Sequence, residues 1–73
     1  MSYKYTVILE HQKEGGYHVF CPALPGCHSE GDTLEAAEEN IKEAMEIYLE
    51  SLKAHGESFP TEDLVIKPLS VAV

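Results

Sequence analysis

The sequence predicts an α+β fold, a β-β-β-α-β arrangement in which an antiparallel sheet carries one long helix on one face. Two patterns predict it. Apolar and polar residues alternate from residue 3 to residue 10, as in a half-buried strand, and apolar residues recur at three- and four-residue steps from residue 34 to residue 52, as in an amphipathic helix. The 73 residues form a single domain, 1–73, because a chain of this length builds only one core.

The first two strands are predicted to form a hairpin. The apolar face of the first strand is expected to meet the core. That face consists of Tyr3, Tyr5, Val7 and Leu9. Gly15 and Gly16 end the polar stretch after this strand, and glycine adopts the positive φ of a tight hairpin turn at little cost. Residues 17–20 then pair antiparallel with the first strand.

A loop rich in proline and glycine comes after the hairpin. Pro22 cannot donate a hydrogen bond to a sheet, and Pro25 with Gly26 fits the centre of a type II turn in which Gly26 has positive φ. Residues 27–30 are long enough for a short third strand, and Gly31 ends it.

The long helix has recognisable ends. We predict Thr33 as its N-cap, although Asp32 as N-cap would form a capping box with Glu35. Gly56 fits the left-handed position that ends a helix. The apolar stripe that faces the sheet consists of Leu34, Ala37, Ile41, Ala44, Met45, Tyr48 and Leu52.

The other side of the helix is acidic. We call Glu39, Glu43, Glu46 and Glu50 the acidic band. Such a band is commonly a solvated face, and the alternative is a surface for a basic partner. Ile47 lies outside the apolar stripe and is a candidate contact with another copy of the chain.

After the helix, we predict a fourth strand at residues 64–67. Pro68 restricts the residues after it to a sheet edge, a bulge or a tail. Leu69, Val71 and Val73 alternate with smaller residues, and an unpaired apolar edge favours aggregation. These three residues are therefore candidate contacts in a homodimer or larger oligomer.

Composition limits the possible partners. Thirteen acidic residues stand against five lysines and no arginine, which gives a net charge of −8. Nucleic-acid binding relies on lysine and arginine, so we expect no direct DNA or RNA binding by this chain. The chain also lacks an apolar run of membrane-spanning length and the basic start of a signal peptide, so we expect a cytoplasmic protein with no membrane partner.

No side chains are predicted to converge into a catalytic or metal site. Cys21 and Cys27 are expected to be buried free thiols; a disulfide is an alternative, and so is a metal cluster with His28, although the cysteine spacing does not match zinc knuckles. Glu30 and Asp32 are either a carboxylate pair or a strand charge and a neighbour of the N-cap. We therefore predict a non-enzymatic protein without a metal or a cofactor.

Several short motifs occur together. The chain carries CPALPGC at residues 21–27, EGDTLEA at 30–36, KEA at 42–44 and YL at 48–49. In this combination, from about residue 3 to residue 60, the chain resembles the HicB-like antitoxin family. The motif residues that we single out are Pro22, Leu24, Pro25, Gly26, Cys27, Gly31, Asp32 and Thr33.

The resemblance implies a degraded RNase H-like fold without the catalytic carboxylates, and assembly into dimers or larger oligomers. It also implies a partner: a HicA-like toxin, which is a small basic mRNA-cleaving protein. Many relatives carry a C-terminal DNA-binding module, whereas this sequence ends at Val73. We therefore expect no autorepression by this chain alone.

Three functions remain as hypotheses. The first is an antitoxin-like protein that occludes a basic toxin. Its candidate partner-binding residues are Glu30, Asp32, Glu39, Glu43, Glu46 and Glu50. The second is an orphan structural or oligomerising domain without a toxin partner. The third is a small metal-dependent hydrolase that uses Glu30 and Asp32.

Overall fold

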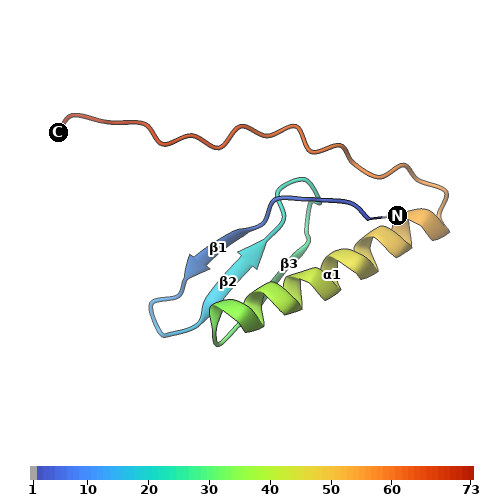
Figure 1. The fold of residues 1–73 in the computed structure, drawn as a ribbon, viewed down its shortest axis with the longest axis horizontal. Coiled ribbons are helices and arrows are strands. Elements are labelled where there is room, and N and C mark those ends of the chain that lie inside the picture. Colours follow the sequence, from blue (N-terminus) through green and yellow to red (C-terminus); the bar gives the residue numbers. More distant parts are fainter. Residues whose placement is uncertain (1) are drawn as a thin grey trace.

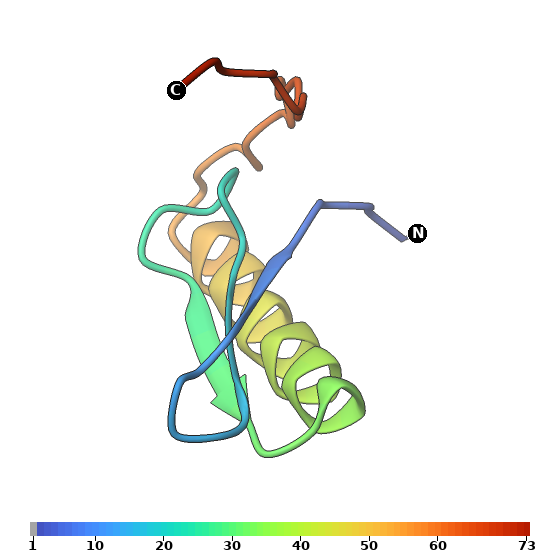
Figure 2. The ribbon, with the colours of Figure 1, turned by 90° about the vertical axis from the view of Figure 1, so that its left-hand side faces the viewer.

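The computed structural model describes residues 2–73. Its elements are β1 Ile8–His11, β2 Tyr17–Phe20, β3 His28–Gly31 and α1 Leu34–Ala54 (Figure 1). The strands form one antiparallel sheet in the order β1-β2-β3, and α1 runs along one face of that sheet (Figure 2). The α+β class and the predicted order of elements are confirmed as far as the helix.

The strand register separates the two faces of the sheet. Leu9 pairs with Val19 on the face that α1 covers, and Val19 is fully buried. Glu10 pairs with His18 on the opposite face, which we call the outer sheet face. The outer sheet face consists of Ile8, Glu10, His18, Phe20, His28 and Glu30.

Glycines close the hairpin as the sequence predicts. The Gln12 amide donates to the Gly16 carbonyl at 2.9 Å, and the Gly15 amide donates to the Gln12 carbonyl at 3.0 Å. Gly15 and Gly16 have φ values of 106° and 79°, a region that other residues enter only with strain. This turn fixes the register of β1 and β2.

The first strand is shorter than predicted, since residues 3–6 contact the C-terminal segment instead of a strand. The Tyr5 hydroxyl donates to the Pro60 carbonyl at 2.6 Å, and the backbone amide and hydroxyl of Thr6 both donate to the Glu62 carboxylate. The predicted apolar face is confirmed for Tyr5, Val7 and Leu9, which pack against the core.

The loop at residues 21–27 folds back into the core. The Cys21 amide donates to the Cys27 carbonyl at 3.0 Å, and the Cys27 amide donates to the Leu24 carbonyl at 2.9 Å. Gly26, at φ 81°, lies inside this second turn, in agreement with the predicted type II turn. The loop thereby inserts Leu24, which is fully buried, beneath the sheet.

Both predicted helix ends are confirmed. The Thr33 hydroxyl accepts a hydrogen bond from the Ala36 amide at 3.0 Å, which makes Thr33 the N-cap. At the other end Gly56 has φ 68°, and its amide donates to the Lys53 carbonyl. The Glu57 amide donates to the Leu52 carbonyl, which completes a Schellman motif.

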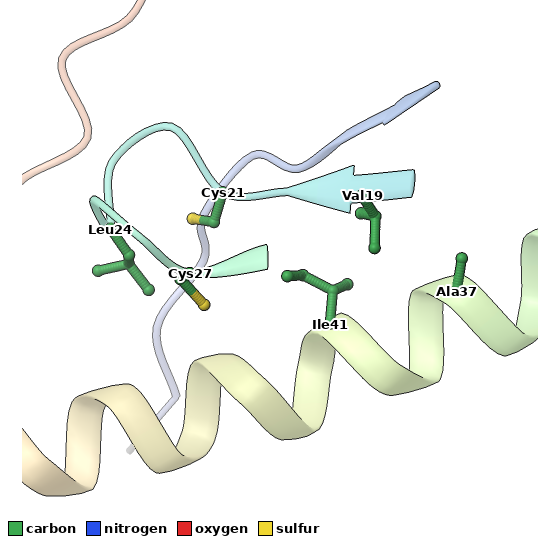
Figure 3. Packing of buried hydrophobic residues seen from close by; sticks show 6 residues of the cluster. All are labelled: Val19, Cys21, Leu24, Cys27, Ala37 and Ile41. Atoms are coloured by element: carbon green, nitrogen blue, oxygen red, sulfur yellow. The ribbon is translucent and has the colours of Figure 1, made fainter. Parts of the chain in front are cut away.

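The core lies between the sheet, the loop and α1 (Figure 3). Its buried members are Val19, Cys21, Leu24, Cys27, Ala37 and Ile41. Ala44, Met45, Tyr48 and Leu49 of α1 pack against this cluster, which confirms most of the predicted stripe and adds Leu49 to it. Two members of the predicted stripe do not pack against the cluster: Leu34, at 42% exposed, and the half-buried Leu52.

The helix and the third strand touch through their backbones. A Cβ atom added to Gly31 would lie 2.4 Å from the Ala37 nitrogen and 2.7 Å from the Ala36 carbonyl carbon. Only glycine permits this approach, so β3 includes Gly31 at the point where α1 comes closest. The side of β3 that carries Gly31 therefore faces the helix, and Glu30 faces away from it.

The predicted fourth strand is wrong for this structure. Residues 57–73 contain no strand, and residues 64–67 are extended without a hydrogen-bonded neighbour strand. The segment contacts the N-terminal residues as far as Glu62 and then runs above the sheet, separate from it (Figure 1). The RNase H-like arrangement that the resemblance implies is not confirmed, because β1 has a partner on one side only.

Replacing Gly31 by alanine should lower the free energy of unfolding by about 2–3 kcal/mol, because the new methyl group must push α1 away from β3. Gly56→Ala is the control: its site has open space, and only the positive φ costs about 1 kcal/mol. Urea denaturation measures the free energy of unfolding of both variants. Equal losses for the two variants would contradict the close contact at Gly31.

The two thiols should react slowly in the folded protein. Burial raises the pKa of Cys21 and of Cys27, both of which are free thiols, and the thiolate is the reactive form. We expect labelling by a thiol reagent at pH 8 to be slow in buffer and to become fast in urea. Fast labelling in buffer, at the rate seen in urea, would show that the loop does not bury these residues.

Candidate functional site

The acidic band lies along the solvent side of α1. Its four members are all exposed, and the helical period places them opposite the buried Ile41. From Glu39 to Glu50 the band extends about 16 Å along the helix axis. Because α1 is capped at both ends and packed along its inner side, the band is carried on a rigid support.

The carboxylates of the acidic band form no ion pair with a lysine or histidine of the described residues. In the described part of the chain, the one ion pair joins His18 Nδ1 to Glu10 Oε1 at 3.5 Å. Lys42 and Lys53 are exposed and line the same hollow as Glu46 and Glu50. The band is therefore an exposed acidic surface that two lysines border on one side.

Glu30 and Asp32 do not belong to the acidic band. Glu30 lies on the outer sheet face, whereas Asp32 is exposed in the turn before the N-cap. The Asn40 side-chain amide donates to the Glu30 backbone carbonyl at 2.8 Å, and both acidic residues border a shallow hollow beside Asn40. The six predicted partner-binding residues are all exposed, but the fold divides them between two sides of the molecule.

The outer sheet face is a second possible surface. His18 lies between Glu10 and Glu30 in one cross-strand row. The His18 ring stacks on Phe20 with 6.0 Å between the ring centroids and lies 5.7 Å from the His28 ring. This cluster was not predicted from the sequence. The sequence did contain a signal for the cluster, because the strand alternation of residues 17–20 puts the side chains of His18 and Phe20 on the same face of the sheet.

The motif residues mainly build the fold. Leu24 and Cys27 belong to the core, and Gly26 permits the turn between them. Gly31 permits the helix contact, and Thr33 caps the helix. Pro22 and Pro25 line a shallow hollow next to the outer sheet face, and Asp32 is exposed. Most of the motif positions therefore shape the loop, the turn and the start of the helix.

The predicted oligomer contacts lie on separate surfaces. Ile47 is 61% exposed and borders the loop residues Gly26 and Cys27. Leu69, Val71 and Val73 are exposed on the segment that leaves the body of the molecule. The structure does not bring Ile47 together with these three residues.

Residues 2–73 contain no group of three or more histidine, cysteine, aspartate or glutamate side chains placed to hold a metal ion. The one helix is too polar to cross a membrane. The structure presents a set of surfaces: the acidic band, the outer sheet face and the exposed C-terminal segment.

Comparison with known proteins assigns the chain to a family. Residues 5–70 match the model of the HicB-like antitoxin of bacterial toxin-antitoxin systems. A UPF0150 protein of Synechocystis sp. is 59% identical over 97% of this chain and 90% of its own length. A UPF0150 protein of Thermoplasma acidophilum is 50% identical over 82% of this chain and 87% of its own length. The chain therefore belongs to the HicB-like antitoxin family, as its motifs predict.

Proposed function

We propose that this chain is an antitoxin that binds a small basic HicA-like toxin and neutralises it by covering the surface that contacts RNA. The observation that carries the proposal is the acidic band, four exposed carboxylates that form no ion pair in the described chain. A protein that binds RNA presents lysine and arginine to phosphates. The band offers such a surface an alternative set of negative charges.

The rigidity of α1 favours the acidic band as the contact surface. Carboxylates on a flexible segment would lose conformational entropy on binding, whereas those on a packed helix are already placed. The like charges of the band repel one another along the helix, at about 0.2–0.5 kcal/mol for each pair at four-residue spacing. A basic partner would offset this repulsion, which favours its binding to the band.

The outer sheet face is the less favoured surface for a basic toxin. Glu10 is already close to His18, and the aromatic and histidine rings make the centre of this face less acidic than α1. Glu30 and Asp32 would contribute at the edge of the complex, near the start of α1. In this proposal the antitoxin is non-enzymatic, needs no cofactor and acts in the cytoplasm.

A second candidate function is a structural or oligomerising domain without a toxin partner. The exposed apolar C-terminal segment favours it, because such a segment serves assembly whether or not a toxin exists. The two functions are distinguished by binding: the antitoxin forms a salt-sensitive complex with a small basic HicA-like toxin, and the orphan domain does not.

Reversing two charges of the acidic band should weaken the toxin complex. For Glu43→Lys with Glu50→Lys, we expect the dissociation constant at low salt to rise at least about tenfold, mainly through a slower association rate. The control is Glu14→Lys with Glu57→Lys, which makes the same change in net charge at exposed sites outside the band. Surface plasmon resonance against a small basic HicA-like toxin measures the association and dissociation rates of both double variants.

Equal weakening by the two double variants would mean that net charge alone attracts the toxin and that the band is not the contact. Tight binding that is insensitive to salt and to both variants would contradict the electrostatic proposal. A growth assay with the toxin expressed should give the same order, with the band variant failing to protect the cells and the control variant protecting them.

A further inference from the structure

Cys21 and Cys27 lie opposite each other, where β2 and β3 meet the two ends of the loop at residues 21–27. The strand register pairs Phe20 with His28, so the next pair along the ladder is Cys21 with Cys27. The Cys21 amide donates to the Cys27 carbonyl at 3.0 Å, which shows that the pairing continues to these two residues. The fold therefore places the two cysteines directly across from each other.

The spacing of such a pair suits a disulfide bond. The Cα atoms of a hydrogen-bonded antiparallel pair lie about 5.5 Å apart, and most disulfides join Cα atoms that are about 5.5–6 Å apart. The Cβ atoms of an opposed pair are about 4.5–5.5 Å apart, against about 3.8 Å in a disulfide, so the two backbones must move slightly closer. The Cys27 amide donates to the Leu24 carbonyl and not back to Cys21, which leaves the pair free to make this movement.

Both cysteine side chains lie on the side of the sheet that faces α1. Val19 packs toward α1, and Cys21 is two residues further along the same strand direction, so the two share a face. On the neighbouring strand Gly31 contacts α1, and Cys27 lies four residues before it, on the same face again. Both cysteines belong to the buried cluster, and both are free thiols (Figure 3). Rotation about the two Cα–Cβ bonds is then the one further movement that a disulfide requires.

We propose that Cys21 and Cys27 form a reversible disulfide that closes the loop at residues 21–27, with a small-molecule disulfide such as oxidised glutathione as the oxidant. One protein thiolate attacks a sulfur atom of the oxidant, which forms a mixed disulfide and releases one reduced glutathione. The second thiolate attacks the protein sulfur of that mixed disulfide, which forms the Cys21–Cys27 bond and releases the second glutathione. The two thiol protons pass to the two released glutathiones, and the protein gives up two electrons to the oxidant. This inference does not depend on the existence of a toxin.

A disulfide fits this core better than the acidic oxidation products of a thiol. Its formation removes two hydrogen atoms and adds no heavy atom, so the volume beside Leu24 and Ile41 changes little. It also creates no charge. Cys21 and Cys27 are 2% and 5% exposed, and a sulfinic acid at either position would bury a charged group without a partner. The oxidised chain can therefore keep the packing of the reduced chain.

The oxidant reaches the pair through the thin cover of the loop. Cys27 borders the hollow beside Ile47 and also the hollow next to the outer sheet face, and Cys21 borders the latter. Burial raises the pKa of both thiols, so little thiolate is present in the closed loop. The exchange is therefore slow and proceeds when the loop opens briefly, in agreement with the slow labelling expected of these thiols.

The disulfide should stabilise the folded chain, because it ties the two ends of the loop that inserts Leu24 into the core. In the oxidised chain these ends can no longer separate on unfolding, which removes conformational freedom from the unfolded state. We expect the unfolding equilibrium constant in water, measured by urea denaturation of the full chain, to fall at least about tenfold on oxidation. The control is Cys21→Ala with Cys27→Ala, whose stability should not respond to the same oxidant.

Equilibration of the full chain with oxidised and reduced glutathione tests the pairing directly. The intact mass should fall by two hydrogen atoms, and a peptide map prepared without reductant should join Cys21 to Cys27. At one glutathione ratio, the ratio of disulfide to dithiol should be at least about tenfold higher in buffer than in urea. Folding and the disulfide favour each other to the same extent, so this factor should equal the fall in the unfolding constant.

Two results would overturn the proposal. The first is a chain that stays reduced, carries only bound glutathione or forms disulfides only between chains, because the two thiols would then not reach each other within the fold. The second is a ratio of disulfide to dithiol that is no higher in buffer than in urea, because the fold would then hold the thiols apart. Both results come from the unmodified chain and so do not depend on how well the alanine variants fold.

Discussion

The contact between Gly31 and the backbone of α1 holds the two layers of this small fold together. With a Cβ atom absent at Gly31, the helix lies directly on β3, and Ala37 and Ile41 reach the buried cluster beneath the sheet. A chain of 73 residues buries only about 60% of its unfolded surface, so it depends on close approach at the few contacts that it has. The loop at residues 21–27 closes the same core from its other end by inserting Leu24.

This arrangement determines where function can lie. The apolar side of α1 is occupied by the sheet, and the cysteines and glycines of the family motif are occupied by the core and its turns. Only the outside of the molecule remains for partners. On α1 that outside is the acidic band, and beyond Glu62 it is the exposed C-terminal segment. The two surfaces differ in chemistry, since one is charged and the other apolar, and they therefore suit different partners.

Features with local signals could be predicted from the sequence to within a residue. The hairpin glycines, the turn at Gly26, the N-cap at Thr33 and the stop at Gly56 each depend on the conformation of a few neighbouring residues, and each is confirmed. Features that depend on distant contacts could not be predicted. The first strand is short because residues 3–6 bind residues 59–62, and no local pattern reveals that contact.

The predicted partner-binding residues, too, could be grouped correctly only where they belong to one element. Helical spacing was sufficient to group the four residues of the acidic band, because they belong to one element. Glu30 was grouped with them on charge alone, and the strand register places it on the other side of the molecule, beside His18. The fourth strand failed for a related reason: alternation at residues 69–73 shows that the segment suits a sheet, but it does not say whether a neighbouring strand pairs with it.

Chemical-shift mapping of the isotope-labelled chain, titrated with a small basic HicA-like toxin, tests most directly whether function lies on the solvent side of α1. We expect the largest shifts to fall on residues 39–50 of α1 and the loop at residues 21–27 to stay unchanged. Shifts centred on Glu10, His18, Phe20 and His28 would place the partner on the outer sheet face and contradict the assignment of function to the acidic band.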